Sequence, residues 1–331
     1  MFPTIYIENE IAEHRKTQQV LAKFPDSLRL SIQRYGQIFN RAQQNFRTQK
    51  SQPDLILAKK HGRWILPAPA GYAIGGSNNY YFSHMMNCIY DCRYCFLQGM
   101  YRSAANVLFV NFEDMLNAIE HTLLQHDNET VYFFSGYDCD SLALDPVSGF
   151  VDAVLPFFAA HPRAVLELRT KSTQIRSLQN HPAIDNCVVA FSLAPAELTT
   201  RYEEKTPSLE KRLTAIAKLQ QQGWPIGLRF DPLILCHNFR QHYGDFFAQV
   251  FKVVDADSLH SVSLGSLRLP QHFFKRLSNL YPDNDLFAAP FACDDNGMMG
   301  YRQNFAEQLH TYCEQELMTY IAPEIYFPCY E

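Results

Sequence analysis

The pattern that most restricts the fold is an alternation of short apolar runs with amphipathic stretches, which begins at Asn79 and continues through most of the chain. The apolar runs are rich in β-branched and aromatic residues, as strands are. They read Y-Y-F-S-H-M, T-V-Y-F-F-S-G, A-V-L-E-L-R-T, C-V-V-A-F-S-L, P-I-G-L-R-F-D-P-L-I-L and S-V-S-L-G-S-L-R-L. Helices are predicted between them over residues 112–125, 208–222 and 243–256. Strands separated by helices favour a parallel sheet, so the sequence predicts an α/β fold, a partial (β/α)6 TIM-like barrel.

The first 78 residues lack this alternation and are predicted to form a separate extension. The stretch L-A-K-F-P-D-S-L-R-L-S-I-Q-R-Y-G is typical of an amphipathic helix, and the part after it, from Q-P-D-L onward, is loop-like. We therefore expect a helical and loop extension over residues 1–78 and a partial barrel with a C-terminal helical segment over residues 79–331. No role is assigned to the aromatic tail E-I-Y-F-P-C-Y-E.

Charge and hydropathy narrow the class of protein. The chain begins without a basic, then apolar, leader, and no apolar run approaches the roughly 18 residues of a membrane span, so a cytoplasmic protein without a membrane partner is expected. The net charge of −5 is not that of a strongly basic nucleic-acid binder. Residues 1–63, however, carry 11 Lys and Arg against 5 Asp and Glu. That excess suits either contact with phosphates or an ordinary solvated helix surface.

Three of the nine cysteines fall within the segment N-C-I-Y-D-C-R-Y-C-F-L-Q-G, with the spacing C-x3-C-x2-C. Cys88, Cys92 and Cys95 have three interpretations. They are unrelated buried thiols, or they form a Cys3His zinc site with His84, or they bind an iron–sulfur cluster. A cluster held by three thiolates keeps one iron open, as a catalytic metal site requires.

Polar residues follow several of the predicted strands. In a barrel-like parallel sheet, functional groups gather at the carboxyl ends of the strands. The candidate rim groups are residues 135–140, 169–172, Ser192, 229–231 and 266–268. The cysteine segment follows the first predicted strand, so we expect it on the same rim.

The cysteine spacing, on a loop after the first strand of a partial barrel, resembles the radical SAM superfamily. More specifically, S-H-M-M-N-C-I-Y-D-C-R-Y-C-F-L-Q-G is similar to the cluster loop of the spore photoproduct lyase family. Further segments of this chain are similar to that family: F-F-S-G-Y-D-C-D-S-L-A-L-D, L-R-T-K-S, A-F-S-L-A-P and R-Y-E-E-K-T-P-S. The resemblance extends from about Leu55 to the end. It implies a lyase-like DNA repair enzyme that uses a [4Fe-4S] cluster to cleave S-adenosyl-L-methionine (SAM) to a 5′-deoxyadenosyl radical.

The resemblance also implies roles for single residues. The metal ligands would be Cys88, Cys92 and Cys95, and Tyr94 would pack near the adenine of SAM. The matching segments place four more residues at the cofactor: Asp140, Ser141, Lys171 and Ser192.

From the residues alone, these side chains also have plainer interpretations. Lys171 suits a rim ion pair, and Ser192 suits a strand-end hydroxyl bonded to nearby backbone. Arg229 and Asp231 suit a buried structural pair or a substrate contact.

Two positions depart from the family pattern. The family returns a hydrogen atom to its substrate through a cysteine after the second strand and a tyrosine directly after the third cluster cysteine. Here these positions hold Tyr137 and Phe96, and Cys139 lies two residues beyond Tyr137. Tyr137 or Cys139 is therefore the candidate hydrogen donor, with Tyr94 retained as a further catalytic candidate. Within a strand, Tyr137 and Cys139 would point to the same face.

The implied partners are a DNA substrate and a one-electron reductant such as flavodoxin or ferredoxin. Chemistry on a base in duplex DNA requires the base to leave the stack, and Tyr80, Tyr81 and Phe82 could either stack on it or belong to the core. Two rival functions remain open at this stage. One is a radical SAM enzyme with a substrate other than nucleic acid, and the other is a zinc-stabilised binding protein without enzymatic activity.

Overall fold

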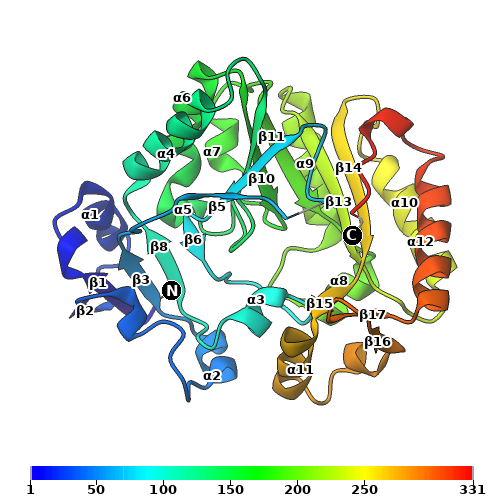
Figure 1. Ribbon diagram of the computed structural model, residues 1–331, viewed down its shortest axis with the longest axis horizontal. Helices are drawn as coiled ribbons and strands as arrows, with labels where there is room; N and C mark the ends of the chain where they lie inside the picture. The colour runs from blue at the N-terminus through cyan, green and yellow to red at the C-terminus, as the bar shows by residue number, and fades with distance from the viewer. Residues whose placement is uncertain (1, 70, 330–331) are drawn as a thin grey trace.

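A seven-stranded sheet forms the centre of the molecule. The computed structural model describes residues 2–69 and 71–329 (Figure 1). Six parallel strands follow one another in chain order, and β4 (Ile65–Pro67) adds to the first of them in the antiparallel direction. The six are β5 (Asn78–Phe82), β9 (Val131–Phe134), β10 (Ala164–Thr170), β11 (Cys187–Ser192), β13 (Ile226–Leu233) and β14 (Leu259–Ser266). The predicted partial (β/α)6 barrel is confirmed.

Helices connect these strands, and the longer ones cover the outer face of the sheet (Figure 1). They are α4 (Phe112–Leu124), α5 (Asp145–Ser148), α6 (Phe150–Ala160), α7 (Arg176–Gln179), α8 (Ala196–Tyr202), α9 (Leu209–Gln221) and α10 (Phe239–Phe251). The helices predicted over residues 112–125 and 208–222 are confirmed. The one predicted over 243–256 instead spans Phe239–Phe251, and its first residue packs its ring against that of Tyr312.

A second sheet joins the start of the chain to the cysteine region. Its order is β2 (Leu28–Ile32), β1 (Thr4–Glu8), β3 (Leu55–Ala58), β8 (Asn106–Phe109) and β6 (Met85–Met86). The helical prediction for residues 1–78 is therefore only partly right. α1 (Arg15–Ala22) and α2 (Phe46–Ser51) are helices, but the stretch predicted as one amphipathic helix contains β2, whose residues pair with β1 in parallel. The division at residue 78 stays a prediction, and this sheet runs across it.

The remaining elements lie beyond the carboxyl ends of the barrel strands or beside β14 (Figure 1). They are β7 (Asp91–Cys92), α3 (Phe96–Met100), β12 (Glu203–Glu204), β15 (Arg268–Pro270), α11 (Gln271–Leu280), β16 (Phe291–Cys293), β17 (Met298–Tyr301) and α12 (Gln303–Leu317). Short 3-10 turns occupy Asn9–Ile11, Tyr35–Gln37, Asp285–Ala288 and Pro323–Ile325. No helix in the described ranges is long and apolar enough to cross a membrane.

The aromatic tail runs along the free edge of β14. The amide of Phe327 donates to the carbonyl of Val262 at 2.8 Å, and the amide of Cys329 donates to that of Leu264 at 3.0 Å. The tail thus extends the sheet beside β14 as far as residue 329. The last two residues of the predicted segment lie outside the described residues.

Candidate active site

The cysteine loop is fixed at both ends by backbone contacts. Asn87 adopts a left-handed conformation (φ 73°), and its side-chain amide donates to the carbonyls of Ser103 at 2.8 Å and Ala105 at 3.2 Å. Further along, β7 pairs with β12, which sets Cys92 opposite Glu203. The amide of Cys95 then donates to the carbonyl of Cys92 at 3.0 Å, and α3 follows. The loop is held in shape by the protein itself.

The three thiols line one cavity of about 130 Å³ at the carboxyl ends of the barrel strands. Residues from the loops after β9 and β10 and from the end of β11 complete its wall: Gly136, Tyr137, Cys139, Asp140, Thr170, Lys171 and Ser192. A second cavity of about 480 Å³ shares Cys92, Cys95 and Tyr137 with the first. It extends towards β15 and α11, so the cysteine site has room beside it for a larger molecule.

The donor set fits a polynuclear cluster better than a single zinc ion. Within the described residues, no three His, Cys, Asp or Glu side chains are close enough together to hold one ion. The structure does not bring His84 into the Cys3His set: its ring stacks on that of Phe150 at 3.7 Å, and its Nδ1 lies 4.0 Å from the sulfur of Cys139. Three thiols spread around one cavity match a four-iron cluster, whose ligands sit at separate corners.

Burial and nearby charge govern the ionisation of the three thiols. Burial raises the pKa of Cys88 to about 12 and raises the pKa values of Cys92 and Cys95, so these thiols need nearby positive charge to ionise. Two cations flank the loop. The ammonium of Lys50, a side chain only 2 % exposed, donates to the carbonyl of Cys88, and Lys171 approaches from the opposite strand end.

Lys171 belongs to a buried ionic network centred on Glu203. The ammonium of Lys171 lies 3.2 Å from the carboxylate of Glu203, which also accepts a hydrogen bond from Arg212 at 2.5 Å and one from the hydroxyl of Tyr94. Burial alone would raise the pKa of Glu203, but Lys171, Arg212 and Tyr94 hold it at about 2. Lys171 is thus already paired with a buried carboxylate.

Asp140 fastens the end of β9 to the end of β10. Its carboxylate accepts hydrogen bonds from the amides of Leu142 at 3.0 Å, Ala143 at 2.9 Å and Lys171 at 2.7 Å, and from the hydroxyl of Thr170 at 2.6 Å. Although it lines the smaller cavity, most of its bonding capacity is used within the protein. The structure therefore gives Asp140 a role in positioning Lys171.

The other two predicted cofactor residues differ in position. Ser192, at the end of β11, lines both cavities. Ser141 does not line either cavity: it is buried, and its hydroxyl lies 2.8 Å from that of Ser135. The serine pair braces the loop after β9.

The two candidate hydrogen donors both lie in the loop after β9. The expectation that Tyr137 and Cys139 share a strand face does not apply, because β9 ends at Phe134. Tyr137 lines both cavities, and its ring lies 4.4 Å from that of Tyr81 and 5.6 Å from that of Phe96. Cys139 lines only the smaller cavity, and its sulfur is 3.8 Å from the carbonyl of Ser135.

The three aromatic residues of β5, Tyr80, Tyr81 and Phe82, have different surroundings. Tyr81 packs on Tyr137, whereas Phe82 is fully buried in the core and Tyr80 bonds His126 through its hydroxyl at 2.7 Å. Tyr80 and Phe82 therefore have structural partners.

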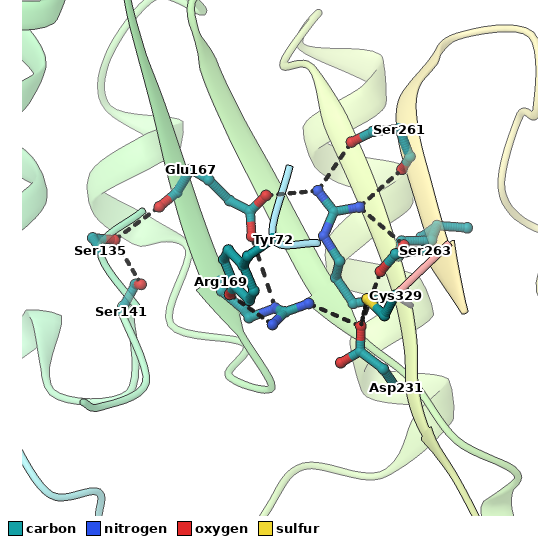
Figure 2. A network of polar contacts seen from close by, with 11 residues as sticks. Tyr72, Ser135, Ser141, Glu167, Arg169, Asp231, Ser261, Ser263 and Cys329 are labelled. Carbon is teal, nitrogen blue, oxygen red and sulfur yellow. Dashed lines mark hydrogen bonds and ion pairs between the residues drawn. The ribbon is translucent and has the colours of Figure 1, made fainter. Parts of the chain in front are cut away.

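Figure 2 shows a polar network inside the barrel. Arg229 does not pair with Asp231. It donates to Glu167 at 2.7 Å, and both side chains are about 1 % exposed, so this is the structural pair. Asp231 lines the larger cavity and accepts a hydrogen bond from Arg169 at 2.9 Å.

Sequence reasoning missed two members of this network that line the larger cavity. Arg169 also donates to the hydroxyl of Tyr72 at 2.7 Å, and the sulfur of Cys329 lies 3.6 Å from Asp231 (Figure 2). Both Tyr72 and Cys329 line the larger cavity. No local pattern marks them, because they come from opposite ends of the chain.

A family model described as spore photoproduct lyase matches residues 73–285, more than half of the chain. The chain belongs to the spore photoproduct lyase family. This confirms the family resemblance and, with it, the radical SAM superfamily.

Curated relatives are distant in sequence. The chain is 21 % identical over 201 residues to spore photoproduct lyase of Bacillus subtilis, which covers 60 % of this chain and 58 % of the relative. It is 22 % identical over 168 residues to that of Clostridium acetobutylicum, covering 50 % of each. The matched part thus spans between half and three-fifths of each of these relatives.

Solved structures of spore photoproduct lyase have the same fold. A mutant with bound AdoMet and dinucleoside spore photoproduct matches with a TM-score of 0.86 at 17 % identity, covering 100 % of this chain and 98 % of that one. A complex with dinucleoside spore photoproduct matches with a TM-score of 0.83, at the same identity and coverage. The barrel, the second sheet and the C-terminal elements are thus all part of a fold known from these structures.

Proposed function

We propose that this protein is a radical SAM enzyme of the spore photoproduct lyase type that acts on a photolesion in DNA. The observation that carries the proposal is the position of the three thiols. They line a small cavity that shares part of its wall with a larger one, so the cysteines could hold a cluster beside space for SAM and a nucleotide.

The residues present would hold the cofactors as follows. Cys88, Cys92 and Cys95 would bind the [4Fe-4S] cluster, and Lys171 and Ser192 would contact SAM in the smaller cavity. When bound, the reduced cluster and SAM supply a 5′-deoxyadenosyl radical that abstracts hydrogen. The carboxylate of SAM would bind Lys171 either in place of Glu203 or together with it. An ammonium carries three N–H donors, so its contact with Glu203 leaves donors for a second carboxylate.

Tyr137 is the better placed hydrogen donor, because it lines both cavities and Cys139 lines only the smaller one. Its phenolic hydrogen would pass to a carbon-centred substrate radical, forming a C–H bond and leaving a tyrosyl radical. One electron from the reductant and one proton would restore the phenol. A flavodoxin or ferredoxin would supply such electrons in the cytoplasm.

The residues at the family's two hydrogen-return positions favour a second candidate function. Phe96 has no O–H group to give, and Tyr137 stands where the family has a cysteine. A radical SAM reaction on a substrate other than DNA would explain both changes without altering the cluster site.

The first test is anaerobic purification followed by iron and zinc analysis and a UV–visible spectrum. We expect a brown protein with about four irons. Cys92→Ala should lose the iron, and Cys187→Ala, which removes a buried thiol in β11, should keep it. A colourless protein with one zinc would refute the proposal.

The substrate is tested next by the formation of 5′-deoxyadenosine. Product that increases with UV-irradiated DNA, and not with unirradiated DNA, supports lesion repair. If iron-loaded protein forms 5′-deoxyadenosine at a rate that neither DNA changes, the result would instead support a substrate other than DNA.

A further inference from the structure

A group of basic residues lies beside the larger cavity, on two segments that are distant in sequence. Arg102 follows α3, and Lys275 and Arg276 belong to α11. The stretches 93–105 and 268–280 that carry them contain no Asp or Glu. We call Arg102 and Arg276 the arginine pair.

Close backbone packing fixes the arginine pair. A side chain on Gly99 of α3 would meet Phe273 of α11, since a Cβ built there would lie 2.5 Å from the Cβ of Phe273. Arg276 also donates to the carbonyl of Gly99 at 3.4 Å, and the amide of Arg102 donates to the side chain of Asn40 at 2.7 Å. The packing of α3 against α11 therefore places the two arginines on adjacent segments, with Arg276 held at the end of α3.

The arginine pair has no carboxylate partner within the parts of the chain that the structure describes. Partial burial and the charge of Arg102 lower the pKa of Arg276. Two like charges near each other, one of them partly desolvated, repel unless an anion lies between them. Two guanidinium groups present planar donors that match the oxygens of a phosphate.

The position of the arginine pair beside the larger cavity indicates which anion it binds. Met100 and Phe273, which line the larger cavity, lie two residues before Arg102 and three residues before Arg276. A nucleotide base in that cavity would leave its phosphodiester at this edge. We propose that the arginine pair binds a backbone phosphate of the DNA strand whose nucleotide enters the larger cavity. This inference rests on the proposed function, since it takes DNA as the substrate.

The sequence had placed possible phosphate contacts on the basic first 63 residues. Their cations Arg15, Lys16 and Lys23 line a separate groove between α1 and α4, together with Glu113 and Asp152. In Figure 1, α1 lies at the left and α11 at the bottom. Acidic residues offset the charge of that groove, so the arginine pair is the better candidate and the α1 groove provides a control.

The test is the salt dependence of binding to a UV-irradiated, thymine-containing oligonucleotide, measured by fluorescence anisotropy on the iron-loaded protein. Each phosphate contact contributes about 0.7 to 0.9 to the slope of log K against log salt. We expect the double variant Arg102→Gln/Arg276→Gln to bind more weakly at low salt. The magnitude of its slope of log K against log salt should be smaller than that of the wild type by about one. Arg15→Gln should keep the wild-type slope.

The double variant Arg102→Lys/Arg276→Lys separates charge from folding. It should retain most of the slope, because the lysines keep both positive charges, and iron content and the melting temperature check that each variant is folded. An unchanged slope in the glutamine variant, or an equal loss in Arg15→Gln, would overturn the inference and leave the proposed function standing. Wild-type protein that binds DNA without salt dependence would refute both this inference and the proposed function.

Discussion

The pair formed by Arg229 and Glu167 should be the most sensitive point in the barrel interior. Arg229 donates to Glu167 at 2.7 Å and to the hydroxyl of Ser261 at 2.9 Å, and its guanidinium lies over Gly227. Replacing Arg229 with Met removes the cation and leaves a carboxylate that is about 1 % exposed. Removing one partner of a buried ion pair typically costs about 3–5 kcal/mol in the free energy of unfolding.

The structure places the expected loss near the lower end of that range. Glu167 retains Arg169, whose Nε lies 3.7 Å away, as a weaker partner. We therefore expect Arg229→Met to lower the free energy of unfolding by about 3 kcal/mol. In the double variant Glu167→Met/Arg229→Met no carboxylate is stranded, so the double variant should lose less than the sum of the two single variants, by about 2 kcal/mol.

The assay is urea unfolding of the metal-free protein under reducing conditions, followed by circular dichroism and by tryptophan fluorescence. Arg201→Met is the control, because it removes one member of an exposed pair with Asp285 and should cost less than about 1 kcal/mol. A loss below 1 kcal/mol for Arg229→Met, or strictly additive losses in the double variant, would show that the pair is not the buried, coupled unit described above.

Three further changes test other parts of the site. Because the pKa of Glu203 falls from 4.5 when exposed to about 2 in the folded protein, its ionic contacts contribute stability above pH 4.5 that is lost as the pH falls towards 2. Urea titrations across that range should show a flatter pH dependence in Glu203→Gln. Gly136→Ala would place a methyl group 2.8 Å from the Cβ of Arg169, and a melting curve should reveal a loss of roughly 1–3 kcal/mol. Lys50→Met removes a buried cation beside Cys88, so an EPR-monitored titration should give a lower midpoint potential for the bound cluster, and Lys50→Arg should stay closer to wild type.

Much of the barrel could be predicted because its signals are local. The barrel strands β9, β10, β11, β13 and β14 are short runs of mostly buried residues rich in apolar side chains, and the cysteine spacing lies within one loop. The first 78 residues were harder to predict because β2 is an edge strand. L-R-L-S-I does alternate apolar and polar residues, as a strand does, but the alternation spans only five residues inside a longer stretch that suits an amphipathic helix. Four of the five residues are exposed, so β2 also lacks the buried face of a central strand.

The site was only partly predictable for a different reason. Its cavity-lining residues Lys171 and Ser192 stand at strand ends, where topology alone places them. Glu203 meets Tyr94 across 109 positions, and Lys50 meets Cys88 across 38. Such contacts depend on how separate elements pack, and no spacing in the sequence encodes them.

The tail beside β14 affects the exposed edge of the barrel sheet. An open parallel sheet presents a row of unpaired carbonyl and amide groups at its last strand, and such a margin is a template for pairing with another chain. The amides of Phe327 and Cys329 occupy that row at Val262 and Leu264, so the tail shields the protein from self-association there. Since the same residues bring Cys329 to the wall of the larger cavity, resistance to aggregation and the shape of the pocket depend on one short segment.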